Sequence, residues 1–133
     1  MDAAELNAFA TGYATAWGSQ QPGNVARFFS EKGSLTINGG PPSVGRAAIA
    51  SAAREFMTAF PDMVVALDGV TGDGERAVFR WTLMGTNTGA GGSGKFVRIS
   101  GSEEWTLGAD GLIAKSLGHF DDREYQRQLR EGT

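Results

Sequence analysis

The sequence predicts an α+β fold in which three helices precede a curved antiparallel sheet. In the first half of the chain, apolar residues recur at the 3.6-residue spacing of amphipathic helices. In the second half, apolar and polar residues alternate, as in strands that bury one face. Short turns rich in glycine separate these strands, which favours a succession of hairpins with the helices packed on one face of the sheet.

The first helix is expected to begin after Asp2 and to end at Trp17. Asp2 and Glu5 have the three-residue spacing of a capping box, and Gly18 is a typical residue for a helix end. One face of this helix is apolar and must pack on the core. It carries Leu6, Phe9, Ala10, Tyr13 and Trp17.

Two further helices are expected before the first long strand. Pro22 suits the first turn of a short second helix, which should carry Val25, Phe28 and Phe29 and stop near Gly33. A short strand over residues 35–37 follows. Ser43 is the expected N-cap of a third helix, which should end before Pro61 because the residue preceding a proline avoids helical geometry.

Four long strands and a short C-terminal helix complete the predicted fold. The first of these long strands, residues 63–70, is so rich in apolar residues that both of its faces are expected to be covered. Asp121 and Glu124 repeat the capping-box spacing and predict the final helix. The four strands are expected at residues 63–70, 76–86, 96–107 and 112–120.

Composition limits the classes of protein to consider. A chain of 133 residues is long enough for one domain, residues 1–133, with a single core. The absence of cysteine excludes disulfides and thiol nucleophiles, and a net charge of −3 with dispersed signs predicts no nucleic-acid binding. The N-terminus lacks a basic region, and no apolar run is long enough to cross a membrane. We therefore expect a cytoplasmic protein that does not contact membranes.

A glutamate on an apolar strand face is the strongest indication of chemistry. Counting by twos along residues 96–107 places Glu103 on the same face as Ile99 and Trp105. An unpartnered buried charge is costly, so this carboxyl group must be paired, protonated or next to a cavity. The sequence therefore predicts a pocket that contains an acid.

The expected register of the last hairpin supports this position. A four-residue turn at residues 108–111 would place Glu104 opposite Lys115 on the solvent side, which is a favourable pair of charges. The same register puts Glu103 beside Ser116, among small side chains. Small side chains around a carboxyl group are typical of a cavity wall.

The order of these segments resembles the nuclear-transport-factor-2-like superfamily, and within it the branch of ketosteroid isomerases and SnoaL-like polyketide cyclases. That fold is a cone, also described as cystatin-like, with three N-terminal helices on the concave face of the sheet. The resemblance therefore implies a deep, mostly apolar pocket and a homodimer. It rests on Tyr13-Ala-Thr-Ala-Trp17 and on the motifs at residues 24–29, 45–49, 81–86 and 121–129.

The resemblance also implies roles for individual residues. Ketosteroid isomerases stabilise a dienolate with a tyrosine of the first helix and a protonated acid of a late strand, and this chain has Tyr13 and Glu103 there. Their general base is an aspartate at the end of the first strand, where residues 35–38 contain no carboxylate. SnoaL-like cyclases take acid–base residues partly from the last strand, which makes His119 or Asp121 a candidate proton carrier.

Each candidate residue also has a purely structural explanation. Tyr13 would be an ordinary core residue, and Glu103 would form a salt bridge to an arginine if the register differed. His119 falls on the outer face of the sheet in the expected register, where it would contact solvent or a second subunit. One histidine and no cysteine disfavour a metal site.

The leading interpretation is an enzyme that needs no cofactor and resembles an ester cyclase, a polyketide cyclase or a ketosteroid isomerase. It would remove a proton next to a carbonyl group of an apolar polyketide, steroid or terpenoid, with Tyr13, Glu103 and His119 as catalytic residues. The residues expected to bind the ligand are Trp17, Phe56, Trp81, Trp105 and Phe120.

Two alternatives remain at the level of the sequence. One is a binding protein that has the same pocket and no turnover, because the expected aspartate near Asn38 is missing. The other is an association module that dimerises or binds partners through the outer face of its sheet. An exposed apolar patch there, with Ile113, Leu117 and Arg80, would support the second alternative.

Overall fold

The computed structural model describes all residues, 1–133, and confirms the α+β class. Its six strands form one sheet in the order β2-β1-β6-β5-β4-β3. The elements are α1 (Ala3–Trp17), α2 (Pro22–Ala26), β1 (Phe29–Ile37), β2 (Ser43–Val44), α3 (Arg46–Ala59), β3 (Val64–Gly72), β4 (Arg76–Thr86), β5 (Phe96–Leu107), β6 (Ile113–Phe120) and α4 (Asp122–Glu131).

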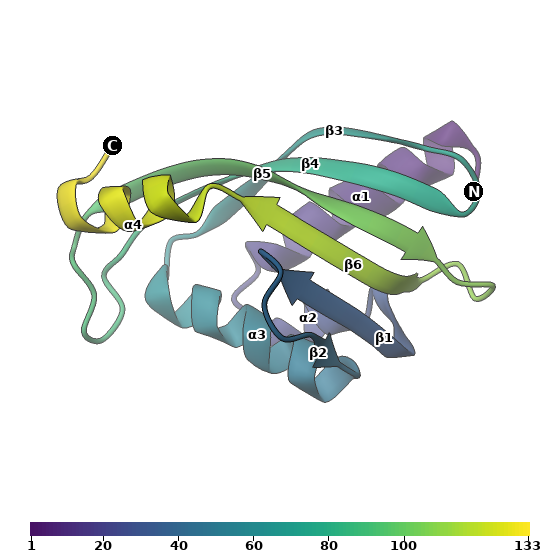
Figure 1. The fold of residues 1–133 in the computed structure, drawn as a ribbon, viewed down its shortest axis with the longest axis horizontal. Coiled ribbons are helices and arrows are strands. Elements are labelled where there is room, and N and C mark those ends of the chain that lie inside the picture. Colours follow the sequence, from purple (N-terminus) through teal and green to yellow (C-terminus); the bar gives the residue numbers. More distant parts are fainter.

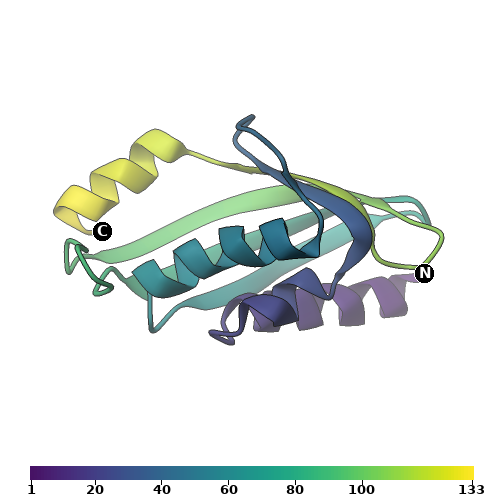
Figure 2. The same cartoon turned by 90° about the horizontal axis from the view of Figure 1, so that it is seen from below.

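The sheet curves around the helices of the N-terminal half. Figure 1 shows the long strands crossing the molecule, with α1 behind the sheet and α3 below it. From below, α1, α2 and α3 lie together on one side of the sheet, while α4 extends beyond it at one end (Figure 2). The sheet does not close, since its edge strands β2 and β3 do not pair with each other. The predicted arrangement of three helices on the concave face is therefore confirmed.

The sheet is antiparallel except for one pair of strands. β3, β4, β5 and β6 follow one another as the predicted hairpins. β1 instead pairs in parallel with β6, a pairing that the prediction of an antiparallel sheet did not include. Parallel neighbours require a long connection, which α3 and the three intervening long strands supply.

The first helix has the predicted ends. The side chain of Asp2 accepts a hydrogen bond from the backbone N–H of Glu5 at 2.8 Å, and the Glu5 side chain accepts one from the backbone N–H of Asp2 at 3.0 Å. This reciprocal capping box satisfies two N–H groups that a helix start leaves unpaired. The helix ends at Trp17, before Gly18.

The second and third helices differ from the prediction at one end each. α2 stops at Ala26, and Phe29 opens β1, where it pairs with Ile113 and is fully buried. The apolar run that suggested a longer helix therefore belongs to the sheet. Ser43 does not cap α3, because it lies in β2, and Gly45 precedes the helix with a φ of 88° that favours glycine.

The prediction that β3 is covered on both faces is wrong. β3 is an edge strand, paired only with β4, and its Val64 is 55% exposed. A dense run of apolar residues does not distinguish a central strand from an edge strand that packs one face on a helix. α1 supplies that packing, because it contacts β3.

No helix in the chain combines the length and the apolar character needed to cross a bilayer.

Gly101 is expected to be required for the packing of Trp81. The two residues lie opposite each other in the β4–β5 ladder, and a Cβ on Gly101 would collide with the Trp81 ring and with the carbonyl oxygen of His119. Gly101→Ala should lower the free energy of unfolding by about 1–3 kcal/mol in urea denaturation. Gly74→Ala is the control, because no atom lies near the added methyl group, and equal effects of the two changes would contradict this explanation.

Candidate active site

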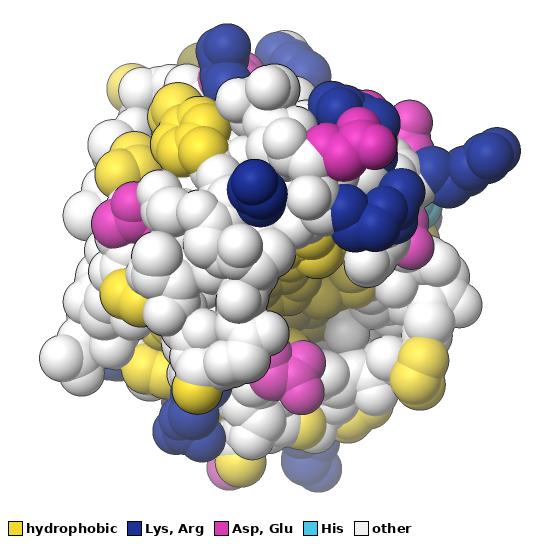
Figure 3. All heavy atoms as spheres, turned by 90° about the vertical axis from the view of Figure 1, so that its left-hand side faces the viewer, with side chains coloured by type: hydrophobic (Ala, Val, Ile, Leu, Met, Phe, Trp, Pro, Cys, Tyr) yellow, Lys and Arg dark blue, Asp and Glu magenta, His cyan; other side chains and the backbone are white.

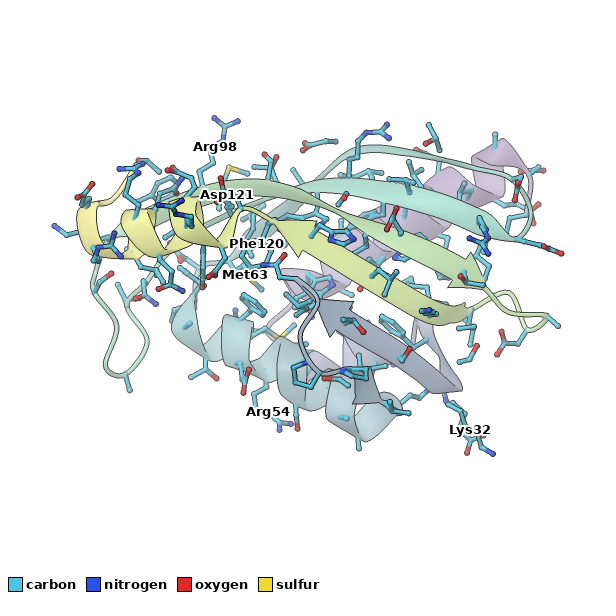
Figure 4. All side chains as sticks on the ribbon, viewed as in Figure 1. Lys32, Arg54, Met63, Arg98, Phe120 and Asp121 are labelled. Carbon is cyan, nitrogen blue, oxygen red and sulfur yellow. The ribbon has the colours of Figure 1, made fainter.

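β5 places Glu103 inside the fold, as the alternation of its residues predicts. Glu103 is only 6% exposed, and Ile99 and Trp105 on the same face are buried too. Arg98 and Glu104 lie on the opposite face and are exposed. Figure 4 shows the Arg98 side chain extending away from the helices. The inward direction of the Glu103 side chain is therefore confirmed.

The expected register of the last hairpin is wrong by two residues. The turn closes one residue later than expected, on the pair Leu107–Ile113, and an adjacent bulge adds another residue. Glu104 consequently lies opposite Leu117 and not opposite Lys115. Because side chains alternate between faces with a period of two, a shift of two residues leaves each of them on its predicted face.

The Glu103 carboxyl group accepts hydrogen bonds from three side chains. The Tyr13 hydroxyl donates to Oε1 at 2.8 Å and lies 3.1 Å from Oε2. The Ser116 hydroxyl and the Trp105 indole N–H donate to Oε1 at 2.7 and 3.1 Å. No basic side chain forms an ion pair with Glu103, so the salt-bridge explanation of its burial is wrong. Oε1 is thus saturated, whereas Oε2 has only the longer contact.

Burial changes the acidity of both members of this pair. Removal from water raises the pKa of Glu103 above its ordinary value, and the hydrogen bonds from Ser116, Trp105 and Tyr13 limit that rise. The pKa of Tyr13 is raised well above its ordinary value, first by burial and then by the nearby charge of Glu103. The site therefore favours a neutral tyrosine and a carboxyl group that binds its proton more tightly than a solvent-exposed one.

A small cavity adjoins the carboxyl group. Its volume is about 40 Å³, and its lining consists of Trp17, Val65, Phe79, Trp81 and Glu103. This space suits one water molecule or one carbonyl group and is too small for a ring. Large aromatic side chains therefore fill most of the interior next to Glu103.

A larger hollow opens at the end of the sheet next to α4. Its volume is about 560 Å³, and Figure 3 shows that end of the molecule hollowed and lined by hydrophobic side chains. We call it the end groove, formed by Ile37, Asn38, Glu55, Phe56, Ala59, Phe120, Asp122 and Tyr125.

The end groove and the small cavity share an aromatic boundary. The ring of Phe56 packs edge-on against Trp17, and that of Phe120 packs edge-on against Trp81, each at 6.0 Å between ring centroids. In each pair the phenylalanine lines the groove and the tryptophan lines the cavity. Four of the five residues expected to bind the ligand thus line one or other of these two hollows.

The fifth expected ligand-binding residue, Trp105, lines neither hollow. It is 2% exposed, stacks on Phe79 with 5.1 Å between ring centroids, and donates its indole N–H to Glu103. Its position is that of a support for the carboxyl group. Ser116, which the expected register places beside Glu103, gives the shortest of the hydrogen bonds to it.

His119 lies on the outer face of the sheet, away from the other two candidate catalytic residues. Its Nε2 is 3.2 Å from Oε2 of Glu104, and its side chain is 53% exposed. The structure brings Tyr13 and Glu103 together and leaves His119 apart from them. No group of three or more His, Asp or Glu side chains in the chain is arranged to hold a metal ion.

Ile113 does not contribute to the outer face of the sheet, where an exposed apolar patch would have supported an association module. This side chain is fully buried, because the bulge at the start of β6 turns it toward the core, and Leu117 is half-buried. Two of the large hydrophobic side chains that are exposed, Val64 and Phe96, lie on the outer face near Arg98, because Phe96 is two residues from Arg98 on β5 and Val64 aligns with Arg98 through Met84 on β4. The other two are Met1 and Val44.

Comparison with known families identifies this architecture. The profile of the SnoaL-like domain matches residues 10–116. The chain belongs to the SnoaL-like family. This membership confirms the resemblance to the SnoaL branch of the nuclear-transport-factor-2-like superfamily. Among proteins with curated functions, none matches the chain.

Solved structures share the SnoaL-like fold over nearly the whole chain. TsrD from Streptomyces laurentii has a TM-score of 0.82 at 20% identity, covering 97% of both chains. A Catenulispora acidiphila protein with a ketosteroid isomerase-like fold, solved with trimethylamine, has a TM-score of 0.81 at 14% identity, and the match covers 91% of both chains. A proposed polyketide cyclase from Xanthomonas campestris has 0.77 at 21% identity, covering 95% of this chain and 97% of its own. At these identities the likeness establishes the fold.

Glu103→Gln should change how stability depends on pH. Because the folded state raises the pKa of Glu103 above 4.5, the wild-type protein should lose stability relative to this variant as the pH rises from 4.5 through the folded-state pKa. The difference should reach about 1.4 kcal/mol for each unit of pKa elevation, measured by urea unfolding between pH 4.5 and 8. Glu104→Gln, at an exposed neighbour, should show a much smaller trend, and a flat difference for Glu103→Gln would contradict the raised pKa.

Tyr13→Phe should raise the pKa of Glu103 further, because it removes a hydroxyl donor that stabilises the charged carboxylate. We also expect the free energy of unfolding to fall by about 1–3 kcal/mol. A carbon-13 NMR titration of the Glu103 carboxyl group measures the first effect. Tyr125→Phe, in the end groove, is the matched control and should leave that titration unchanged.

Proposed function

We propose that this SnoaL-like protein is an enzyme of the cyclase or isomerase type, which promotes loss of a proton next to a carbonyl group of an apolar ligand. The observation that carries the proposal is the carboxyl group of Glu103, buried without a cation and next to a cavity. Buried carboxyl groups are usually paired with a cation or bound to a metal ion, and no cation pairs with this one.

Glu103 would act in its protonated form. Its Oε1 accepts hydrogen bonds from Tyr13, Trp105 and Ser116, so the proton belongs on Oε2. From there it donates a hydrogen bond to the carbonyl oxygen of the ligand. When the adjacent C–H bond breaks, its electron pair forms the C=C bond of an enolate, and the growing negative charge on oxygen strengthens that hydrogen bond.

A water molecule or a basic group of the ligand would take the proton from carbon. Asn38 occupies the region where ketosteroid isomerases carry their aspartate, and its Oδ1 already accepts a hydrogen bond from the backbone N–H of Phe120 at 2.9 Å. His119 lies on the other face of the sheet. The enolate then takes a proton at another carbon in an isomerisation, or attacks a second carbonyl group in an aldol cyclisation.

The end groove suits an aromatic or polycyclic ligand. Its volume of about 560 Å³ is within the usual range for small-molecule sites, and Phe56, Phe120 and Tyr125 contribute aromatic surface. The proposed polyketide cyclase from Xanthomonas campestris, whose fold this chain shares, supports a polyketide-like substrate. Such molecules combine flat apolar rings with carbonyl groups.

A second candidate is a binding protein that uses the same hollows without turnover. The observation in its favour is Asn38, which stands where a carboxylate general base is expected. Its side chain already accepts a hydrogen bond from the backbone N–H of Phe120. Both candidates would bind the ligand, so a measurement of affinity does not distinguish them, whereas a measurement of turnover does.

Exchange of hydrogen for deuterium in 2-acetonaphthone tests the enzymatic proposal. This ketone has a flat apolar body and a methyl group next to its carbonyl. In D₂O the wild-type protein should accelerate deuterium uptake at that methyl group, measured by NMR. Glu103→Gln should reduce the acceleration by about 100-fold, because an amide is a far weaker acid, while the ketone should bind only about 3- to 10-fold more weakly.

Glu104→Gln is the matched control, since it removes the neighbouring carboxylate on the outer face of β5. Its exchange rate should equal that of the wild-type protein. Binding of the ketone with no acceleration in the wild-type protein would contradict the enzymatic proposal and favour the binding protein.

A further inference from the structure

Two buried hydrogen-bond donors in this protein have no partner. They are the indole N–H groups of Trp17 and Trp81. Trp17 is only 8% exposed, and the Nε1 atoms of both residues are shielded from solvent. The Trp17 indole lies near enough to the Tyr13 hydroxyl to oppose the rise in the Tyr13 pKa that burial causes, yet it makes no well-formed hydrogen bond to it. A buried donor without an acceptor is costly, so a pair of them calls for an explanation.

Both donors belong to residues that line the same small cavity as Glu103. The other two lining residues, Val65 and Phe79, offer no oxygen or nitrogen acceptor in their side chains. Oε1 of Glu103 already accepts three hydrogen bonds. With Oε2 protonated, as the proposed function requires, that oxygen is a third donor, so these side chains leave the cavity short of an acceptor, which an oxygen atom from outside the chain would supply.

We propose that Trp17 and Trp81 bind the carbonyl oxygen of the ligand in this cavity through their indole N–H groups. The inference deepens the proposed function, on which it rests, because the oxygen held by the two indoles would be the one that faces protonated Glu103. A carbonyl oxygen has two lone pairs and an enolate oxygen has three, so the two indoles and Glu103 can all donate to it once proton loss has formed the enolate, which they thereby stabilise.

The volume of the cavity limits the class of ligand. About 40 Å³ admits a carbonyl oxygen and its carbon and excludes a ring. The ligand would therefore present an unhindered aldehyde or ketone at the edge of its apolar body. That body would occupy the end groove, and the carbonyl group would pass the aromatic pairs Trp17–Phe56 and Trp81–Phe120.

A pair of probes of the same shape tests the role of the two N–H groups. In 2-isopropenylnaphthalene a CH₂ group replaces the carbonyl oxygen of 2-acetonaphthone. Trp17→Phe and Trp81→Phe remove a donor and keep an aromatic ring. Each should weaken binding of the ketone roughly 3- to 10-fold and leave binding of the alkene unchanged, as measured by titration calorimetry. Equal losses for both probes would indicate a packing effect and overturn the proposal.

The wild-type protein provides a second measurement that does not depend on the folding of any variant. The chain has three tryptophans, hence three indole N–H signals in a nitrogen-15 correlation spectrum. The ketone should move the Trp17 and Trp81 signals downfield, whereas Trp105, which already donates to Glu103, should move less. The alkene should produce no such shift. If the ketone binds and neither of the two signals moves downfield, the cavity holds only water and the proposal is wrong.

Failure of this inference can be distinguished from failure of the proposed function. If Glu103→Gln abolishes deuterium exchange while the tryptophan variants bind the ketone normally, the enzyme assignment stands and the indole donors are overturned. If the tryptophan variants lose affinity for the ketone while the wild-type protein does not accelerate exchange, the donors are supported and the enzymatic function fails.

Discussion

The hydrogen bonds to the Glu103 carboxyl group organise the centre of this protein. Their donors come from three elements, with Tyr13 on α1, Trp105 on β5 and Ser116 on β6. One buried acid thus fixes the helix against the middle of the sheet. It also aligns two neighbouring strands with each other. A charged carboxylate is costly at this depth, and these bonds reduce that cost without a counter-ion.

The same arrangement explains why the interior is narrow. Tyr13 packs edge-on against Phe79 and Trp105, and these two rings stack on each other beneath Glu103. The rings that hold the carboxyl group in place also occupy the space that a deep pocket would need. What remains is a small cavity at Glu103 and the broader end groove outside it. In the proposed complex, the cavity would bind one polar atom of the ligand and the groove would bind its apolar body.

Much of the fold and half of the site could be predicted from the sequence because they depend on local patterns. Alternation along β5 places Glu103 on the buried face of the sheet, and this does not depend on the register with the neighbouring strands. Helical spacing places Tyr13 on the buried face of α1. The bulge at Ile113 and the early end of α2 depend on contacts between distant segments, which no local pattern records. The unpaired indoles of Trp17 and Trp81 belong to the same class, because only the packed structure shows that no acceptor reaches them.

The parallel pairing of β1 with β6 has a consequence for the order of folding. β1 lies between the two-residue strand β2 and the last strand of the sheet, so its main hydrogen-bonded neighbour is synthesised about 80 residues after it. Until β6 leaves the ribosome, the nascent chain has nowhere to bury Phe29 beside Ile113. Completion of the sheet is thus a late event in synthesis, and apolar side chains of β1 such as Phe29 stay without their strand partner until then.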